Sequence, residues 1–132
     1  MYSHIIVGAR DLTLMGRFYE RVLAEIGLEV MADENDGGPP GKGWQRPGQR
    51  WPQFFVQLPF NGQPAAPGNG TQVSFACDSR EQVDAAWAAA LANGGSDEGS
   101  PGVRARYAPD YYGAYCRDPE GNKLCFVHAV GL

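Results

Sequence analysis

The sequence predicts one α+β domain of two tandem βαβββ modules, which form a curved, partly closed mixed sheet around a pocket. Two observations predict this fold. The order strand, helix, strands occurs twice within 132 residues, at an offset of 68 residues, the separation of His4 and Gln72. A chain of this length also suits a single domain with its own core. We expect one module at residues 1–60, a linker at 61–70 and a second module at 71–130.

The first module begins with an apolar strand from His4 to Val7. Asp11 follows, and aspartate caps helices by accepting hydrogen bonds from N–H groups of the first turn. Apolar residues then recur at helical spacing, at Leu14, Met15, Phe18, Tyr19, Val22, Leu23 and Ile26. Gly27 suits the end of this helix. The other strands of the module are expected at Leu28–Val30, around Trp44 and at Phe54–Leu58.

The second module repeats this order. A strand is expected at Gln72–Ala76, and Ser79 with Gln82 forms a capping box for the next helix. The buried face of that helix is predicted to carry Val83, Trp87, Ala90 and Leu91. Corresponding positions at the 68-residue offset are His4 with Gln72, Tyr19 with Trp87, Leu23 with Leu91, Gly27 with Gly95, and Gln57 with Cys125.

A hairpin turn is predicted at Asp118-Pro119-Glu120-Gly121-Asn122. Proline suits the second position of a type I turn, and glycine suits the left-handed position after it. A three-residue loop pairs Asp118 with Asn122 and sets Tyr115 opposite Cys125 on the same face. A two-residue loop pairs Cys116 with Cys125 instead. The turn chemistry favours the first register.

Composition excludes several classes of protein. The formal net charge is −4, and no basic run offers a footprint for phosphates, so nucleic-acid binding is not expected. No apolar stretch reaches the length of a membrane span, and residues 1–4 lead directly into a strand, so we expect a cytoplasmic protein that does not bind membranes. The three cysteines show no CxxC spacing, which predicts buried free thiols.

The repeat and the D-P-E-G-N hairpin resemble the vicinal oxygen chelate superfamily, which includes glyoxalase I, bleomycin-resistance proteins and extradiol dioxygenases. The resemblance implies a pocket between the modules, a homodimer, and metal ligands at His4, Gln57, Gln72 and Cys125. Only His4 keeps a usual ligand type. One imidazole, two neutral amides and one thiol suit a divalent ion poorly, so neither a metal nor another cofactor is expected.

The leading hypothesis is therefore a protein that binds a small molecule in the inter-module pocket, as bleomycin-resistance proteins do. The residues expected to line that pocket are His4, Trp44, Gln57, Gln72, Tyr115 and Cys125. Arg104 and Arg106 belong to a polar loop, where plain surface arginines are the commoner interpretation and a lip that binds anions over the pocket is the alternative. One alternative is a metal-dependent lyase or dioxygenase-like enzyme with this atypical ligand set. Another is a non-catalytic, dimeric regulatory module. The sequence assigns no catalytic residue.

Overall fold

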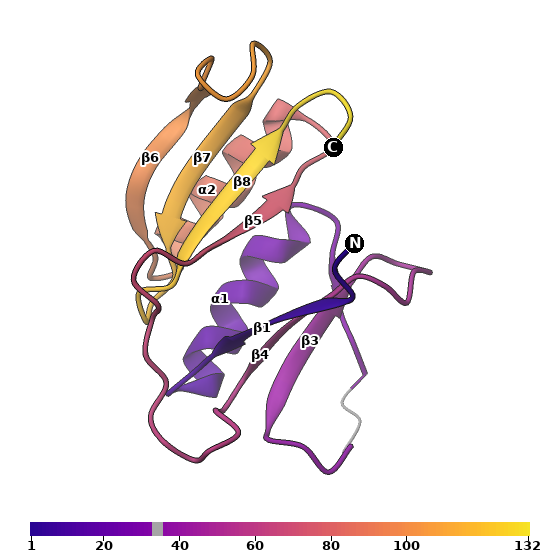
Figure 1. Ribbon diagram of the computed structural model, residues 1–132, viewed down its shortest axis with the longest axis vertical. Helices are drawn as coiled ribbons and strands as arrows, with labels where there is room; N and C mark the ends of the chain where they lie inside the picture. The colour runs from indigo at the N-terminus through magenta and orange to yellow at the C-terminus, as the bar shows by residue number, and fades with distance from the viewer. Residues whose placement is uncertain (33–35) are drawn as a thin grey trace.

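The computed structural model describes residues 1–32 and 36–132 and shows two modules, each a helix packed on a four-stranded sheet (Figure 1). The first module consists of β1 (His4–Gly8), α1 (Leu12–Ala24), β2 (Glu29–Val30), β3 (Gly41–Gln45) and β4 (Gln53–Gln57). The second consists of β5 (Gln72–Ala76), α2 (Arg80–Ala92), β6 (Ser96–Val103), β7 (Tyr112–Arg117) and β8 (Lys123–His128). The segment between β4 and β5 joins them.

The strand orders are β1-β4-β3-β2 and β5-β8-β7-β6, with β1 parallel to β4 and β5 parallel to β8. The predicted fold class is thus confirmed. One difference from the prediction is that the strands form two separate sheets, neither of them closed, rather than one curved sheet. The modules meet instead through α1 and α2, which pack against each other.

The two helices obey the predicted offset at both ends, since Leu12 corresponds to Arg80 and Ala24 to Ala92. Each is capped as expected: the Asp11 carboxylate accepts from the Leu14 N–H at 2.9 Å, and the Ser79 hydroxyl accepts from the Gln82 N–H at 3.2 Å. No helix within the described ranges is long and apolar enough to cross a membrane.

One core joins the two modules. Tyr19 of α1 packs against Phe54, whose ring lies 5.0 Å away, and Phe54 in turn contacts Phe75 of the second module at 5.1 Å. Trp44 pairs with Phe54 across the ladder and faces α1, with only 1% of its surface exposed. Trp44 is therefore mainly a core residue, because strand alternation places it on the helix side of its sheet.

The hairpin has the predicted three-residue register. Asp118 N–H donates to the Asn122 carbonyl at 2.9 Å, and Tyr115 pairs with Cys125. Asp118 is 3% exposed, and its carboxylate accepts from the Glu120 and Asn122 N–H groups and from the Asn122 amide. A fourth hydrogen bond comes from the Tyr19 hydroxyl of the first module at 2.7 Å. The turn is thus tied to the other module.

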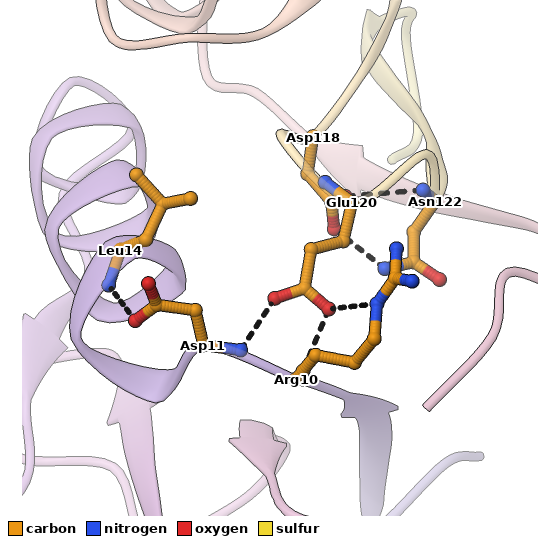
Figure 2. Close-up of polar contacts among 6 residues, drawn as sticks. All are labelled: Arg10, Asp11, Leu14, Asp118, Glu120 and Asn122. Carbon is orange, nitrogen blue, oxygen red and sulfur yellow. Dashed lines mark hydrogen bonds and ion pairs between the residues drawn. The ribbon is translucent and has the colours of Figure 1, made fainter. Parts of the chain in front are cut away.

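Glu120 makes a second tie between the modules (Figure 2). Its carboxylate accepts from the backbone N–H groups of Arg10 at 2.6 Å and Asp11 at 2.9 Å, and Arg10 Nε lies 3.5 Å away. Asp11 is the residue that caps α1. The hairpin of the second module therefore holds the start of the first helix, and we call these contacts of Asp118 and Glu120 the hairpin clamp.

The register of the last strand differs from the prediction. His4 pairs with Gln53, whereas Gln72 pairs with Lys123, so the ladders correspond at an offset of 70 residues rather than 68. The position equivalent to Cys125 is consequently Phe55 and not Gln57. The reason is that the chain between the helix and the last strand is two residues longer in the second module.

Candidate functional site

Each sheet packs one face on its helix and leaves the other face open. Alternation places Gln72, Lys123 and Cys125 of neighbouring strands on the open face of the second sheet. Tyr115 of β7 pairs with Cys125 and shares that face. The fold thereby gathers these four side chains from three strands.

A pocket of about 450 Å³ lies on this open face. Its walls come from β5, β6, β7 and β8 and from the loop between β6 and β7. It is lined by Gln72, Glu98, Arg104, Arg106, Tyr107, Tyr111, Tyr115 and Lys123. This volume is within the range of sites that bind small molecules.

Two phenols and a thiol form one hydrogen-bonded group at this pocket. The Tyr111 hydroxyl lies 3.2 Å from the Tyr115 hydroxyl and 3.5 Å from Cys125 Sγ. Burial raises the pKa of Cys125 and of both phenols, and the Cys125 contact raises the pKa of Tyr111 further. All three groups therefore keep their protons at neutral pH. Each hydroxyl carries one proton, so with Tyr111 as the donor within the group the Tyr115 hydroxyl can donate a hydrogen bond to a ligand.

Three cationic side chains line the same pocket. The Arg104 guanidinium and the Lys123 ammonium each lie 5.7 Å from the centre of the Tyr115 ring, and Arg104 also donates to the Ser100 carbonyl at 2.8 Å. The Arg106 guanidinium lies 4.8 Å from the Tyr107 ring. Within residues 1–32 and 36–132, none of the three cations forms an ion pair. Arg104 and Arg106, for which plain surface positions were the favoured interpretation, thus line the pocket together with Lys123.

The open face of the first sheet differs in character. The Phe55 ring lies across Gly43, where a Cβ would come within 2.6 Å of it, and stands edge-on to the His4 ring at 6.2 Å. A second pocket of about 250 Å³ lies between the modules and includes His4, Trp44 and Phe75. The Trp44 Nε1–H, which is buried there, has no hydrogen-bond partner among the described residues.

The structure thus distributes the predicted site residues over two pockets. Gln72 and Tyr115 line the larger pocket, and Cys125 is fully buried behind Tyr111. His4 and Trp44 line the smaller one, whereas Gln57 lines neither of these two.

Sequence reasoning missed Tyr111 and Lys123 as site residues. Lys123 carries a usable signal, since it lies two residues before Cys125 on the same strand and alternation gives both the same face. Tyr111 precedes β7 in a loop, where no periodicity fixes the direction of a side chain. The Tyr111 hydroxyl reaches Tyr115 and Cys125, on β7 and β8, only through the folded conformation of this loop.

The residues at the expected metal positions do not fit a divalent ion. Gln57 lies four residues along β4 from Gln53, the partner of His4, a separation of about 13 Å. Cys125 is a buried, protonated thiol on the other sheet, whereas a metal ligand would be the thiolate. Across the parts of the chain that the structure describes, no three His, Cys, Asp or Glu side chains form a group suited to a metal ion.

The two βαβββ modules in this order, with a pocket on an open sheet face, place this chain in the class of duplicated βαβββ folds. The family model for the Glyoxalase/Bleomycin resistance protein/Dioxygenase superfamily matches residues 2–126. The chain belongs to this superfamily, which confirms the resemblance seen in the sequence.

Solved structures agree with this assignment. A glyoxalase/bleomycin resistance protein from Albidiferax ferrireducens T118 is 39% identical with a TM-score of 0.82, and the match covers 98% of both chains. A lactoylglutathione lyase from Agrobacterium tumefaciens shares the fold at 21% identity and a TM-score of 0.65, over 98% of this chain and 93% of that one. No curated protein matches the sequence.

Proposed function

We propose that this protein binds a small molecule in the larger pocket and does so without a divalent metal ion. The observation that carries the proposal is the pocket of about 450 Å³, in which hydrogen-bond donors and aromatic rings converge on one sheet face. The donor set at the positions of the family's metal supports the second half of the proposal, because amides and a protonated thiol are weak ligands.

The side chains have separate tasks in this proposal. The Tyr115 hydroxyl donates a hydrogen bond, the Gln72 amide donates or accepts, and the tyrosine rings supply apolar contact. Among the described residues that line the pocket, there is no pair of an activated nucleophile and a general base. The proposal is therefore binding, in line with the bleomycin-resistance half of the name given to the 39% identical relative.

Metal content and ligand response test the two halves separately. We expect protein purified without chelator or histidine tag to hold no stoichiometric zinc, iron, nickel or manganese by elemental analysis. We also expect some compounds of a small-molecule panel to raise the melting temperature, an effect that Tyr115→Ala removes. A stoichiometric metal that is lost in His4→Ala would refute the metal-free half and favour the lyase-like or dioxygenase-like alternative. A panel without any response would favour a regulatory module.

The proposal includes a cytoplasmic homodimer. The open face of the first sheet carries Ile6, which is 48% exposed, and Tyr2 and Trp51 lie nearby at 68% and 48% exposure. Burial of such residues between two copies is favourable by about 25 cal/mol per Å² of apolar surface. Light scattering is expected to give twice the chain mass, and Ile6→Glu is expected to give monomers. A monomeric parent protein would contradict this part.

A further inference from the structure

We infer that the ligand of the larger pocket is a small planar aromatic oxyanion, that is, an aromatic compound with a carboxylate or phosphate group. This inference rests on the proposed function, which it deepens by naming the ligand class. The pocket shows an excess of positive charge, an excess of hydrogen-bond donors, and walls of aromatic rings.

The charges of the pocket are not balanced. Its lining includes Arg104, Arg106 and Lys123 but one carboxylate, Glu98. Glu98 accepts from Arg117 Nε at 2.7 Å, so its charge is already compensated. The chain as a whole has a formal net charge of −4. A local concentration of unpaired cations in an acidic protein indicates a site that attracts anions.

Neutral groups hold these cations in place. Arg104 is fixed by the Ser100 carbonyl and the Tyr115 ring, and Lys123 lies beside the same ring. Arg117, the neighbour of Lys123 across the ladder, already pairs with Glu98, which leaves the charges of Lys123 and Arg104 uncompensated among the described residues. An oxyanion near Lys123 and Arg104 would compensate these charges and accept hydrogen bonds from both.

The remaining groups favour an aromatic ligand that accepts hydrogen bonds. Tyr111 and Tyr115 are protonated, and with Tyr111 as the donor within its own hydrogen-bonded group Tyr115 can donate to the ligand. The Tyr107 and Tyr111 rings lie 5.1 Å apart at 56°, and together with Tyr115 they form an aromatic wall. Aromatic rings gain from tilted or offset contact with one another. A pocket of about 450 Å³ is at the small end of ligand sites, which favours a molecule of one or two rings.

Isothermal titration with four probes tests the ligand class. Benzoate and phenyl phosphate carry both features, benzyl alcohol carries the ring without the charge, and inorganic phosphate carries the charge without the ring. We expect at least one aromatic anion to bind about tenfold more tightly than either single-feature probe, and to weaken as ionic strength rises. The tighter of benzoate and phenyl phosphate identifies the oxyanion.

Matched variants place the binding in this pocket. Arg104→Gln and Lys123→Gln are each expected to weaken the aromatic anion about fivefold to tenfold. The control is Arg50→Gln, since the Arg50 guanidinium lies 5.3 Å from the Trp51 ring in the first module, a similar stacking contact away from the pocket. Circular dichroism checks that all variants are folded.

The outcomes separate the inference from the proposed function. If benzyl alcohol binds as tightly as benzoate and Lys123→Gln has no effect, the inference is wrong although a binding pocket exists. If neither aromatic anion binds at millimolar concentration, the inference is equally wrong. The uncharged compounds of the thermal-shift panel then test the binding function: a response to one of them supports it, and no response contradicts it.

Discussion

The two modules share one backbone plan but distribute their chemistry in opposite ways. At equivalent ladder positions the first sheet carries Gly43 opposite Phe55, whereas the second carries Tyr115 opposite Cys125. The large aromatic side chain thus lies on the last strand, β4, in the first sheet and on β7, the neighbour of the last strand, in the second. In the first module its ring covers the glycine and fills the open face, and in the second it leaves room for the pocket. The two halves therefore share a scaffold, and the proposed binding site lies on one of them.

The two modules also differ in the contacts that each makes with the start of the other module's helix. The hairpin of the second module holds Arg10 and Asp11 at the start of α1 through Glu120, whose side chain is 9% exposed. In the pseudo-symmetric place Arg46 of the first module reaches Asp78, before α2, at 3.5 Å, and the Asp78 side chain is 64% exposed. The first contact has a largely shielded carboxylate that accepts two backbone hydrogen bonds, and the second is a surface ion pair.

The largest expected effect is the loss of the buried carboxylate of this clamp. Asp118→Ala leaves the buried Tyr19 hydroxyl and two turn N–H groups without their acceptor, so we expect it to lower the free energy of unfolding by about 3 kcal/mol. Tyr19→Phe removes one of those bonds and is expected to cost about 1 kcal/mol. Urea unfolding measures both. If Asp78→Ala lowers the free energy of unfolding as much as Asp118→Ala does, the two contacts between the modules do not differ as described.

A smaller effect is expected at Glu120. Glu120→Gln removes the charge that compensates Arg10 while keeping an oxygen for one backbone N–H, and we expect a cost of about 1.5 kcal/mol. Urea unfolding is again the measurement, with Glu29→Gln on the exposed strand β2 as a control that is expected to be neutral. A neutral Glu120→Gln would show that the clamp adds nothing to stability.

Alkaline pH is expected to destabilise the protein through the second module, which contains all three cysteines. Burial raises the pKa of Cys77 and Cys116 to about 12, from about 9 for an exposed thiol. The unfolded thiols therefore ionise first, and stability present below pH 9 is lost as the pH rises towards 12. Between pH 8 and pH 10 the expected loss is about 1 kcal/mol per buried thiol. Cys116→Ala should reduce the slope, and an unchanged slope would contradict the assignment.

The smallest effect is expected at the surface ion pair of the first module. Arg46→Gln breaks an exposed contact at 3.5 Å, and such pairs contribute less than about 1 kcal/mol. We expect a change within about 0.5 kcal/mol in the same unfolding assay. A cost equal to that of Glu120→Gln would mean that the two inter-module contacts are equivalent after all.

Local chemistry made part of this fold predictable. The two helices follow from their caps and their 3.6-residue spacing, and the hairpin register follows from the Pro119 and Gly121 positions. These features depend on residues a few positions apart. The hairpin clamp and the site depend on less local contacts: Glu120 and Arg10 of the clamp are 110 residues apart in sequence, and Tyr111 of the site reaches Cys125 from a loop. Phe55 was not predicted as the equivalent of Cys125, because a single ungapped offset does not account for the longer connection between the helix and the last strand of the second module.

The offset of 70 residues in the last strand, against 68 in the helices, has a consequence for how such halves diverge. Side chains alternate along a strand, so an insertion of one residue exchanges its two faces, whereas an insertion of two leaves each residue on its original face. The hydrophobic interior tolerates the second kind. Each side chain nevertheless moves two residues along its strand, a distance of about 7 Å. Even-numbered insertions thus relocate a binding position without rebuilding the interior.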